Sequence, residues 1–270
     1  MVPGHVELLA DADRPGGFLT LVDRVRQSYV DLDDPTYLDF EYMQTFAQIL
    51  DTLRSGPLAV THIGAGGCTL PRYIAAVRPR SSQIVLEPDG EVIAVLRAQL
   101  PLPRGSGIRI RQIDGRRGVA VLADASADVL IVDAFDDGRV PAELSTREFV
   151  ADVLRVLKQD GVLMMNVADG PPGTYVRRLV ATLSEAMPEV MLCADPSVLK
   201  RRRFGNIVLA ASRVPLPVLE LAQAAARAPF PTSVLAGSQL APLLSGVVPL
   251  TDDDAMSSFE PPAATWRVSD

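Results

Sequence analysis

The stretch that decides the fold is residues 58–67, LAVTHIGAGG, an apolar run of strand length followed by a glycine-rich turn. After an amphipathic stretch comes a second apolar run, QIVLEPDG at 83–90, which ends on Glu87. Runs that are apolar on both faces, with helical stretches between them, are typical of a buried parallel sheet covered by helices. The pattern therefore predicts a doubly wound α/β fold whose first strand is the run before the glycines.

The same alternation continues toward the C-terminus. Three further apolar runs, at 108–113, 128–135 and 161–167, would add parallel strands. The last two runs, 189–194 and 206–212, are joined by a short basic connection, which predicts an antiparallel pair at one edge and a total of seven strands. We expect helices at 68–77, 89–100, 115–122, 145–158 and 173–186.

The two ends of the chain have different patterns. Residues 5–32 form short alternating runs separated by turn formers, which predicts two or three antiparallel strands. The helical spacing that follows at 36–53 leads into the α/β region. We therefore expect three parts: an N-terminal β-hairpin segment (1–35), a Rossmann-like nucleoside-binding domain (36–213), and a C-terminal helix at about 216–228 with an extended tail (214–270).

Composition excludes several classes of protein. The chain has 270 residues, 48% of them hydrophobic, with 33 acidic and 26 basic residues, a net charge of −7 and a sequence pI near 5.0. A general nucleic-acid binder would be basic, and no window has the roughly 18 uninterrupted apolar residues of a membrane helix. The two cysteines have neither metal-ligand nor redox spacing. We expect a reduced cytoplasmic protein without a metal site and without nucleic-acid or membrane partners.

The glycine-rich turn predicts a nucleoside site. Gly64, Gly66 and Gly67 would let the backbone approach a ligand and direct helix N-terminal amides at it. Glu87 lies 23 residues after Gly64, where an acid accepts both hydroxyls of a ribose. The loop lacks the third glycine of the dinucleotide fingerprint, because Thr69 or Leu70 occupies that place, so NAD is disfavoured.

A second pair of residues favours an adenosyl ligand. Asp114 and Gly115 directly follow the third predicted strand. Acids at this position of the class I methyltransferase fold accept a hydrogen bond from the adenine amino group. That fold also has an antiparallel last strand, as expected here.

The order and spacing of several short motifs resemble the spermidine synthase family of aminopropyltransferases, in particular its shorter, divergent bacterial branch. The similarity runs from about residue 17 to 212. It rests on Gln27-Ser28, Asp39-Phe40-Glu41-Tyr42, the loop at 64–67, Glu87, Asp114-Gly115, the segment Val132-Asp133-Ala134-Phe135-Asp136, and Phe204-Gly205-Asn206. The resemblance implies a class I S-adenosylmethionine-methyltransferase-like fold, an adenosyl thioether or sulfonium ligand, a deprotonating aspartate at Asp133, and an N-terminal hairpin domain that helps to build a homodimer.

The chemistry of Asp133 agrees with this role. Transfer of an alkyl group from a sulfonium to an amine requires a free nitrogen lone pair, so a carboxylate must first accept a proton from the ammonium. Asp133 ends a buried predicted strand, and we expect Tyr42 and Asp136 to orient the amine. The expected enzyme is a transferase that alkylates a small-molecule amine of polyamine type, with decarboxylated S-adenosylmethionine or S-adenosylmethionine as donor.

Departures from the family pattern leave alternatives open. The family has an aspartate at the position of Gly67, where it holds the amine of the aminopropyl donor, so we expect Gly67→Asp to favour the decarboxylated donor. Met43, Gln44, Ala134 and Phe135 also differ from the family motifs. One alternative is an S-adenosylmethionine-dependent methyltransferase in which Arg72 pairs with the methionyl carboxylate. Another is a non-catalytic nucleoside-binding or assembly protein.

Overall fold

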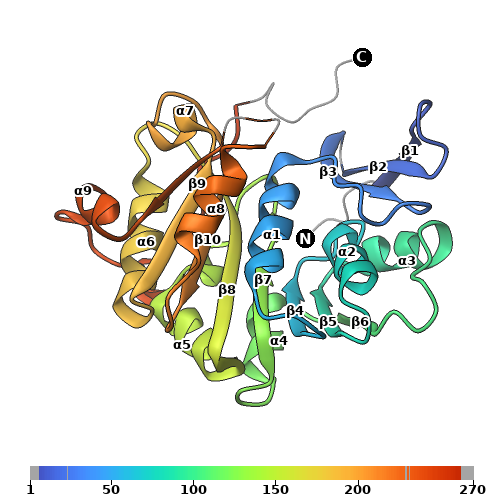
Figure 1. Cartoon of the computed structure of the whole chain (residues 1–270), viewed down its shortest axis with the longest axis horizontal. Coiled ribbons are helices and arrows are strands. Elements are labelled where there is room, and N and C mark those ends of the chain that lie inside the picture. Colours follow the sequence, from blue (N-terminus) through green and yellow to red (C-terminus); the bar gives the residue numbers. More distant parts are fainter. Residues whose placement is uncertain (1–5, 23, 229, 231, 263–270) are drawn as a thin grey trace.

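A small antiparallel sheet precedes the main body of the molecule. The computed structural model describes residues 6–22, 24–228, 230 and 232–262. The first sheet has the order β1-β2-β3, and its strands are β1 (Val6–Ala10), β2 (Gly17–Val22) and β3 (Val25–Asp31). Figure 1 shows this sheet at one end of the molecule, beside α2 (Thr69–Val77) and α3 (Gly90–Gln99). The prediction of an N-terminal hairpin segment is confirmed.

The central sheet is mostly parallel, as predicted. Its order is β11-β9-β10-β8-β7-β4-β5-β6, with β4, β5, β6, β7 and β8 parallel to one another and β10 antiparallel to both β8 and β9. The bounds of these strands are β4 (Ala59–Ile63), β5 (Ser82–Glu87), β6 (Ile108–Gln112), β7 (Ala127–Val132), β8 (Leu157–Asp169), β9 (Glu189–Ala194), β10 (Gly205–Ser212) and β11 (Ser233–Ala236).

The predicted number of strands was wrong. Within the described residues the central sheet has eight strands, because β11 pairs antiparallel with the outer side of β9. The predicted antiparallel pair, β9 and β10, is present but does not form the edge. The segment after residue 213 therefore adds a strand to the sheet, which satisfies backbone groups that β9 would otherwise leave unpaired.

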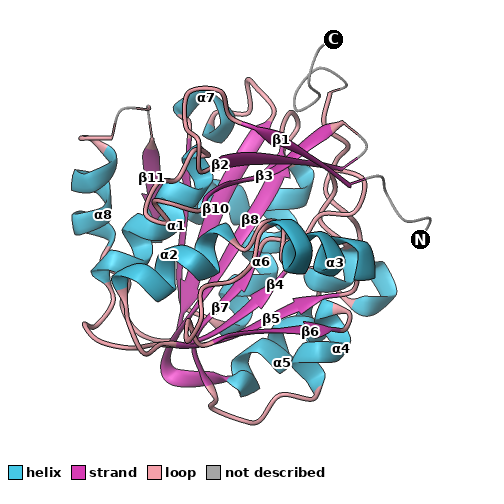
Figure 2. Cartoon of the chain, turned by 90° about the vertical axis from the view of Figure 1, so that its right-hand side faces the viewer, coloured by secondary structure: helices cyan, strands magenta, loops and turns pink. Residues whose placement is uncertain are grey.

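Helices cover both faces of the sheet (Figure 2). On one face, α1 and α2 pack against apolar side chains of β4, β7, β8, β9 and β10. On the opposite face, α4, α5 and α6 share a core with the other side of the same strands. The remaining helix bounds are α1 (Glu41–Thr52), α4 (Gly115–Ala120), α5 (Arg147–Val156), α6 (Thr174–Ala186), α7 (Pro196–Leu199), α8 (Val218–Ala225) and α9 (Ala241–Leu244).

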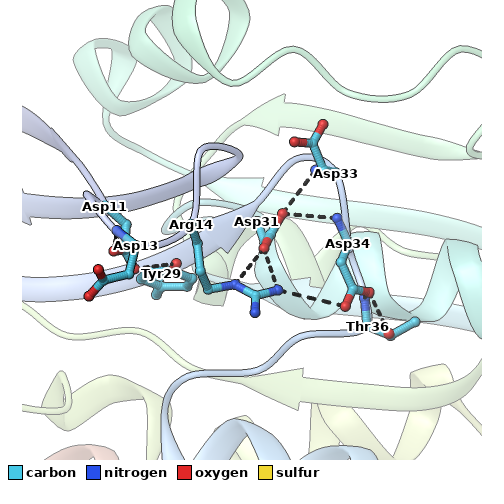
Figure 3. A network of polar contacts seen from close by, with 8 residues as sticks. All are labelled: Asp11, Asp13, Arg14, Tyr29, Asp31, Asp33, Asp34 and Thr36. Carbon is cyan, nitrogen blue, oxygen red and sulfur yellow. Dashed lines mark hydrogen bonds and ion pairs between the residues drawn. The ribbon is translucent and has the colours of Figure 1, made fainter.

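A polar network fixes the loop between β3 and α1. Arg14 donates to Asp31 at 2.8 Å through Nε, and its guanidinium lies 3.8 Å from the carboxylate of Asp34 (Figure 3). The other carboxylate oxygen of Asp31 accepts from the backbone N–H groups of Asp33 and Asp34 at 2.9 Å. Arg14 also stacks on Tyr37, 3.8 Å from the ring centroid. These contacts set the path of the chain into α1.

The described part of the chain after β11 follows the surface of the second helical face. Arg178 of α6 donates to the backbone oxygens of Val248 and Pro249 at 3.0 Å, and Arg116 of α4 forms an ion pair with Asp252 at 2.9 Å. The buried Leu250 donates its N–H to Thr182 Oγ1 at 2.8 Å.

In the described part of the chain, no helix combines the length and the apolar character needed to cross a membrane.

Candidate active site

Four predicted site residues lie in a row at one edge of the sheet. Gly64, Glu87 and Asp133 stand at or directly after the carboxyl ends of β4, β5 and β7, and Asp114 follows β6. Because these strands are parallel and neighbours in the order β7-β4-β5-β6, the four residues follow one another along the edge. The strand order reverses between β4 and β7, which is where open α/β sheets bind ligands.

The glycine loop brings two of these strand ends together. Gly64 donates its N–H to Leu86 O at 2.9 Å, and Asp133 donates its N–H to Ile63 O at 2.9 Å. Gly64 has φ +94°, and an added Cβ would lie 2.2 Å from the backbone oxygen of Asp133. A side chain here would push the loop away from Asp133, so glycine is required.

Glu87 lies under the loop and caps it. Its Oε2 accepts from the N–H of Ala65 at 2.9 Å, and its Oε1 accepts from the N–H of Asp89 at 2.9 Å. Burial raises the pKa of this carboxyl, and the two backbone donors act in the opposite direction. A carboxylate has about four acceptor positions, so each oxygen keeps one for a further donor. Glu87 can therefore hold the loop and accept ligand hydroxyls together.

Asp114 begins α4. Its Oδ1 accepts from the backbone N–H of Arg117 at 3.0 Å, as a helix N-cap does. Gly115 follows, and an added Cβ there would lie 2.3 Å from Ile63 Cγ2. The glycine therefore lets α4 start against the end of β4, which keeps Asp114 beside the row.

Asp133 is held by two side chains from different elements. Asn166 of β8 donates from Nδ2 to Oδ1 at 2.9 Å, and Tyr42 of α1 donates from its hydroxyl to Oδ2 at 3.3 Å. Burial raises the pKa of Asp133 to about 6, while the hydrogen bonds from Asn166 and Tyr42 lower it. Burial and the adjacent Asp133 raise the pKa of the Tyr42 phenol well above its ordinary value. Asp133 is thus a carboxylate that can take up a proton near neutral pH.

A cavity of about 580 Å³ lies on the β8 and β10 side of Asp133. Tyr42 and Asn166, the two partners of Asp133, both line it. Its other walls come from the start of β3, the start of α1, the loop after β7, the end of β9, the connection from β9 to β10, the start of β10, and residues Thr232 and Pro262. The cavity and the glycine loop therefore lie on opposite sides of Asp133 along the sheet edge.

Sequence reasoning missed Asn166. The residue is 2% exposed, and its Oδ1 is a buried atom without a hydrogen-bond partner among the described residues. An asparagine inside the apolar strand run at 161–167 was the available signal, because a buried amide requires a partner. Its pairing with Asp133 depends on the parallel register of β7 and β8, which only the fold reveals.

The structure brings Tyr42 to Asp133, which lies behind the lining residues Tyr42 and Asn166, and Asp136 is also not part of the cavity lining. Asp136 is exposed, and its backbone pairs with Arg139 across a turn, with N–O distances of 2.8 and 3.0 Å. The role of Asp136 in orienting an amine stays a prediction.

Two expectations do not fit the structure: that an aspartate at position 67 would favour the decarboxylated donor, and that Arg72 would pair with a methionyl carboxylate. An added Cβ at Gly67 would lie 2.4 Å from Val30 Cγ2 and 2.8 Å from Ser28 Oγ, so a side chain there would run into β3. A Gly67→Asp carboxylate would therefore not reach a donor without displacing β3. Arg72 is 3% exposed and donates to the backbone oxygens of Gly67, Leu100 and Pro101, so it is not available to a ligand carboxylate.

A solved structure is similar to this chain over most of its length. The crystal structure of a probable spermidine synthase from Corynebacterium glutamicum is 30% identical to this chain, covers 92% of each chain, and superposes with a TM-score of 0.84.

The chain belongs to the spermidine synthase family.

Other comparisons agree with this assignment. A curated polyamine aminopropyltransferase from Chromobacterium violaceum is 33% identical over 157 residues, which cover 57% of this chain and 59% of the relative. The matched part of the chain thus spans about three fifths of that relative. Human methyltransferase-like protein 13 is 23% identical over 70% of this chain and 91% of its own, with a TM-score of 0.58, which shows a shared methyltransferase-like fold. No protein-family profile matches the chain.

In the described ranges, no group of three or more histidine, cysteine, aspartate or glutamate residues is arranged to hold a metal ion. The row from Asp114 to Asp133 and the adjacent cavity offer hydrogen-bond acceptors and carboxylates.

Proposed function

We propose that this protein transfers an aminopropyl group from decarboxylated S-adenosylmethionine to a small-molecule amine of polyamine type. The observation that carries the proposal is the position of Asp133. This carboxylate, with a pKa of about 6, stands between the glycine loop and the cavity and is held by Tyr42 and Asn166. The name of the curated relative, polyamine aminopropyltransferase, supports the same reaction.

The donor would lie along the row of strand ends. Glu87 would accept the ribose hydroxyls, and Asp114 with Gly115 would contact the adenine. The backbone of Gly64, Gly66 and Gly67 would face the remainder of the nucleoside. Neighbouring strands are about 4.8 Å apart, and β5 is two strands from β7, so the ribose site and Asp133 are separated by about 10 Å. This spacing suits a nucleoside whose sulfonium group extends toward Asp133.

The reaction then needs one proton acceptor. The ionised Asp133 would take a proton from the acceptor ammonium, which frees the nitrogen lone pair. That lone pair attacks the carbon bound to sulfur, and the carbon–sulfur electron pair returns to the sulfur, leaving methylthioadenosine as a neutral thioether. A positioned general base contributes about 10²- to 10⁴-fold to such a step.

The cavity suits a cationic acceptor. Of the acids that line it, Asp39 pairs with Arg26 and Asp195 pairs with Arg203, each at 3.5 Å. Glu41 is the lining carboxylate for which the described residues provide no ion pair. Glu41 on the cavity wall would hold one ammonium group of a diamine, and Asp133, which lies behind the lining residues Tyr42 and Asn166, would serve the other.

The test is the release of methylthioadenosine from decarboxylated S-adenosylmethionine with and without 1,4-diaminobutane. We expect amine-dependent release by the wild type and a loss of at least 100-fold in Asp133→Asn. Transfer of a methyl group from S-adenosylmethionine would instead support a methyltransferase. Tight methylthioadenosine binding without turnover would support a non-catalytic binding protein.

A further inference from the structure

The loop that follows Asp133 is paired with a distant part of the chain. Val140 donates its N–H to Ser258 Oγ at 2.9 Å, and Ser258 donates its own N–H to Val140 O at 3.3 Å. Ser258 is 2% exposed and Val140 is fully buried, so water has little access to the groups that form these two hydrogen bonds. One residue before, Arg139 forms an ion pair with Glu260 at 2.6 Å. Residues 258–262, the C-terminal strap, therefore run along the end of this loop.

Among the described residues, the backbone hydrogen bonds that shape the loop between Asp133 and Val140 are local ones. Its backbone hydrogen bonds join Asp136 and Arg139 to each other, and Asp137 and Gly138 have positive φ angles of 48° and 72°. This geometry makes a local turn, which does not by itself fix where the turn lies relative to the sheet. Ala134, Phe135 and Val140 pack against the main apolar core, and the pairing of Val140 with Ser258 adds a polar restraint at the end of the loop.

The C-terminal strap also reaches the cavity. Phe135 and Gly138 of the loop line the cavity, and so does Pro262 of the C-terminal strap. The chain before the C-terminal strap is fixed to the helical face, since Asp254 pairs with Arg178 at 2.5 Å and Asp252 pairs with Arg116 at 2.9 Å. The C-terminal strap thus connects a fixed region to the cavity wall beside Asp133.

We infer that the C-terminal strap is a positioning element for the acceptor amine, with Ser258 as its main residue. It sets the wall formed by Phe135, Gly138 and Pro262 and has no role in binding the nucleoside. The inference rests on the proposed function, because that function identifies the cavity as the acceptor site. The row that would hold the donor, from Asp114 to Gly64, makes no hydrogen bond or ion pair with the C-terminal strap among the described residues.

The test compares Ser258→Ala with Ser257→Ala, a neighbouring serine that is not fully buried. Ser258→Ala leaves the buried Val140 N–H without an acceptor, so we expect the KM for the amine to rise about tenfold, with smaller changes in kcat and none in methylthioadenosine affinity. Ser257→Ala should match the wild type. Ser258→Thr, which keeps the hydroxyl oxygen, should recover part of the lost amine affinity.

A second variant and a second readout keep the test decisive. Glu260→Arg replaces an exposed ion pair with repulsion against Arg139 without touching the core, so it serves if Ser258→Ala does not fold. Hydrogen–deuterium exchange of residues 134–140 should be faster in either variant. If both variants keep the wild-type KM for the amine and the wild-type exchange rate of residues 134–140, the inference is wrong. A wild type without any transfer activity would refute the proposed function alone, and exchange would still show whether the C-terminal strap holds the loop.

Discussion

Replacing Asp133 by asparagine should make the protein more stable and abolish its activity. Burial raises the pKa of Asp133 from 3.8 to about 6, so the folded protein disfavours the ionised carboxylate. A raised pKa adds stability below pH 3.8, where the group is protonated in both states, and that stability is lost as the pH rises through 6. At pH 8 the wild type therefore carries a destabilising charge that asparagine lacks.

The size of the effect follows from the pKa shift. One pKa unit corresponds to about 1.36 kcal/mol, so a shift of about two units gives an upper value of about 3 kcal/mol in the free energy of unfolding. Asparagine keeps the shape of the side chain, and its Oδ1 can still accept from Asn166 while its amide donates to the Tyr42 hydroxyl. For a chain of this size, about 3 kcal/mol corresponds to about 6 to 12 °C in Tm.

The assay is thermal unfolding by circular dichroism at pH 8 and at pH 3.5, with transfer activity measured beside it. We expect Asp133→Asn to raise the Tm at pH 8, to leave it nearly unchanged at pH 3.5, and to lower kcat by about 10²- to 10⁴-fold. Glu143→Gln, which changes an exposed carboxylate in the short 3-10 helix Ala142–Leu144, is the control and should change neither quantity. The wild-type rate should fall as the pH drops below 6. A variant that is less stable than the wild type at pH 8 would refute this reasoning.

Three further predictions concern the nucleoside side and the assembly. Glu87→Gln should weaken methylthioadenosine binding about 10- to 100-fold by calorimetry because it removes a charge-assisted acceptor, whereas the exposed Glu91→Gln should leave it unchanged. Gly67→Ala should lower the free energy of unfolding by about 1–3 kcal/mol in urea titrations, since the added methyl meets Val30; an unchanged midpoint would show that β3 yields easily. Light scattering should give twice 29.0 kDa, because β1 is an edge strand available to a second copy; a mass of 29.0 kDa at micromolar concentration contradicts this.

The sequence allowed most of the fold to be predicted because its signals are local. The apolar runs and the turn after Ile63 define the strands, and Gly64 follows β4 while Glu87 ends β5, both at the expected edge. The strand β11 was not predicted, because the run at 233–236 is short and becomes a strand only by pairing with β9.

The site could be predicted only in part, because side-chain direction depends on packing. Tyr42, which was expected to orient the amine, lies 3.3 Å from Asp133, the expected base. The burial of Arg72 against backbone carbonyls, the direction of a Cβ at Gly67 toward Val30, and the bond from Asn166 to Asp133 all depend on contacts between distant segments. No spacing in the sequence shows such contacts.

The central claim is that Asp133 removes a proton from an amine that then receives an aminopropyl group. The most direct measurement is mass spectrometry of the amine after incubation of the wild type with decarboxylated S-adenosylmethionine and 1,4-diaminobutane, with Asp133→Asn in parallel. We predict that the wild type adds one aminopropyl group and releases an equal amount of methylthioadenosine, and that the variant adds almost none. An unmodified amine in the presence of bound donor, or equal product from Asp133→Asn, would contradict the account.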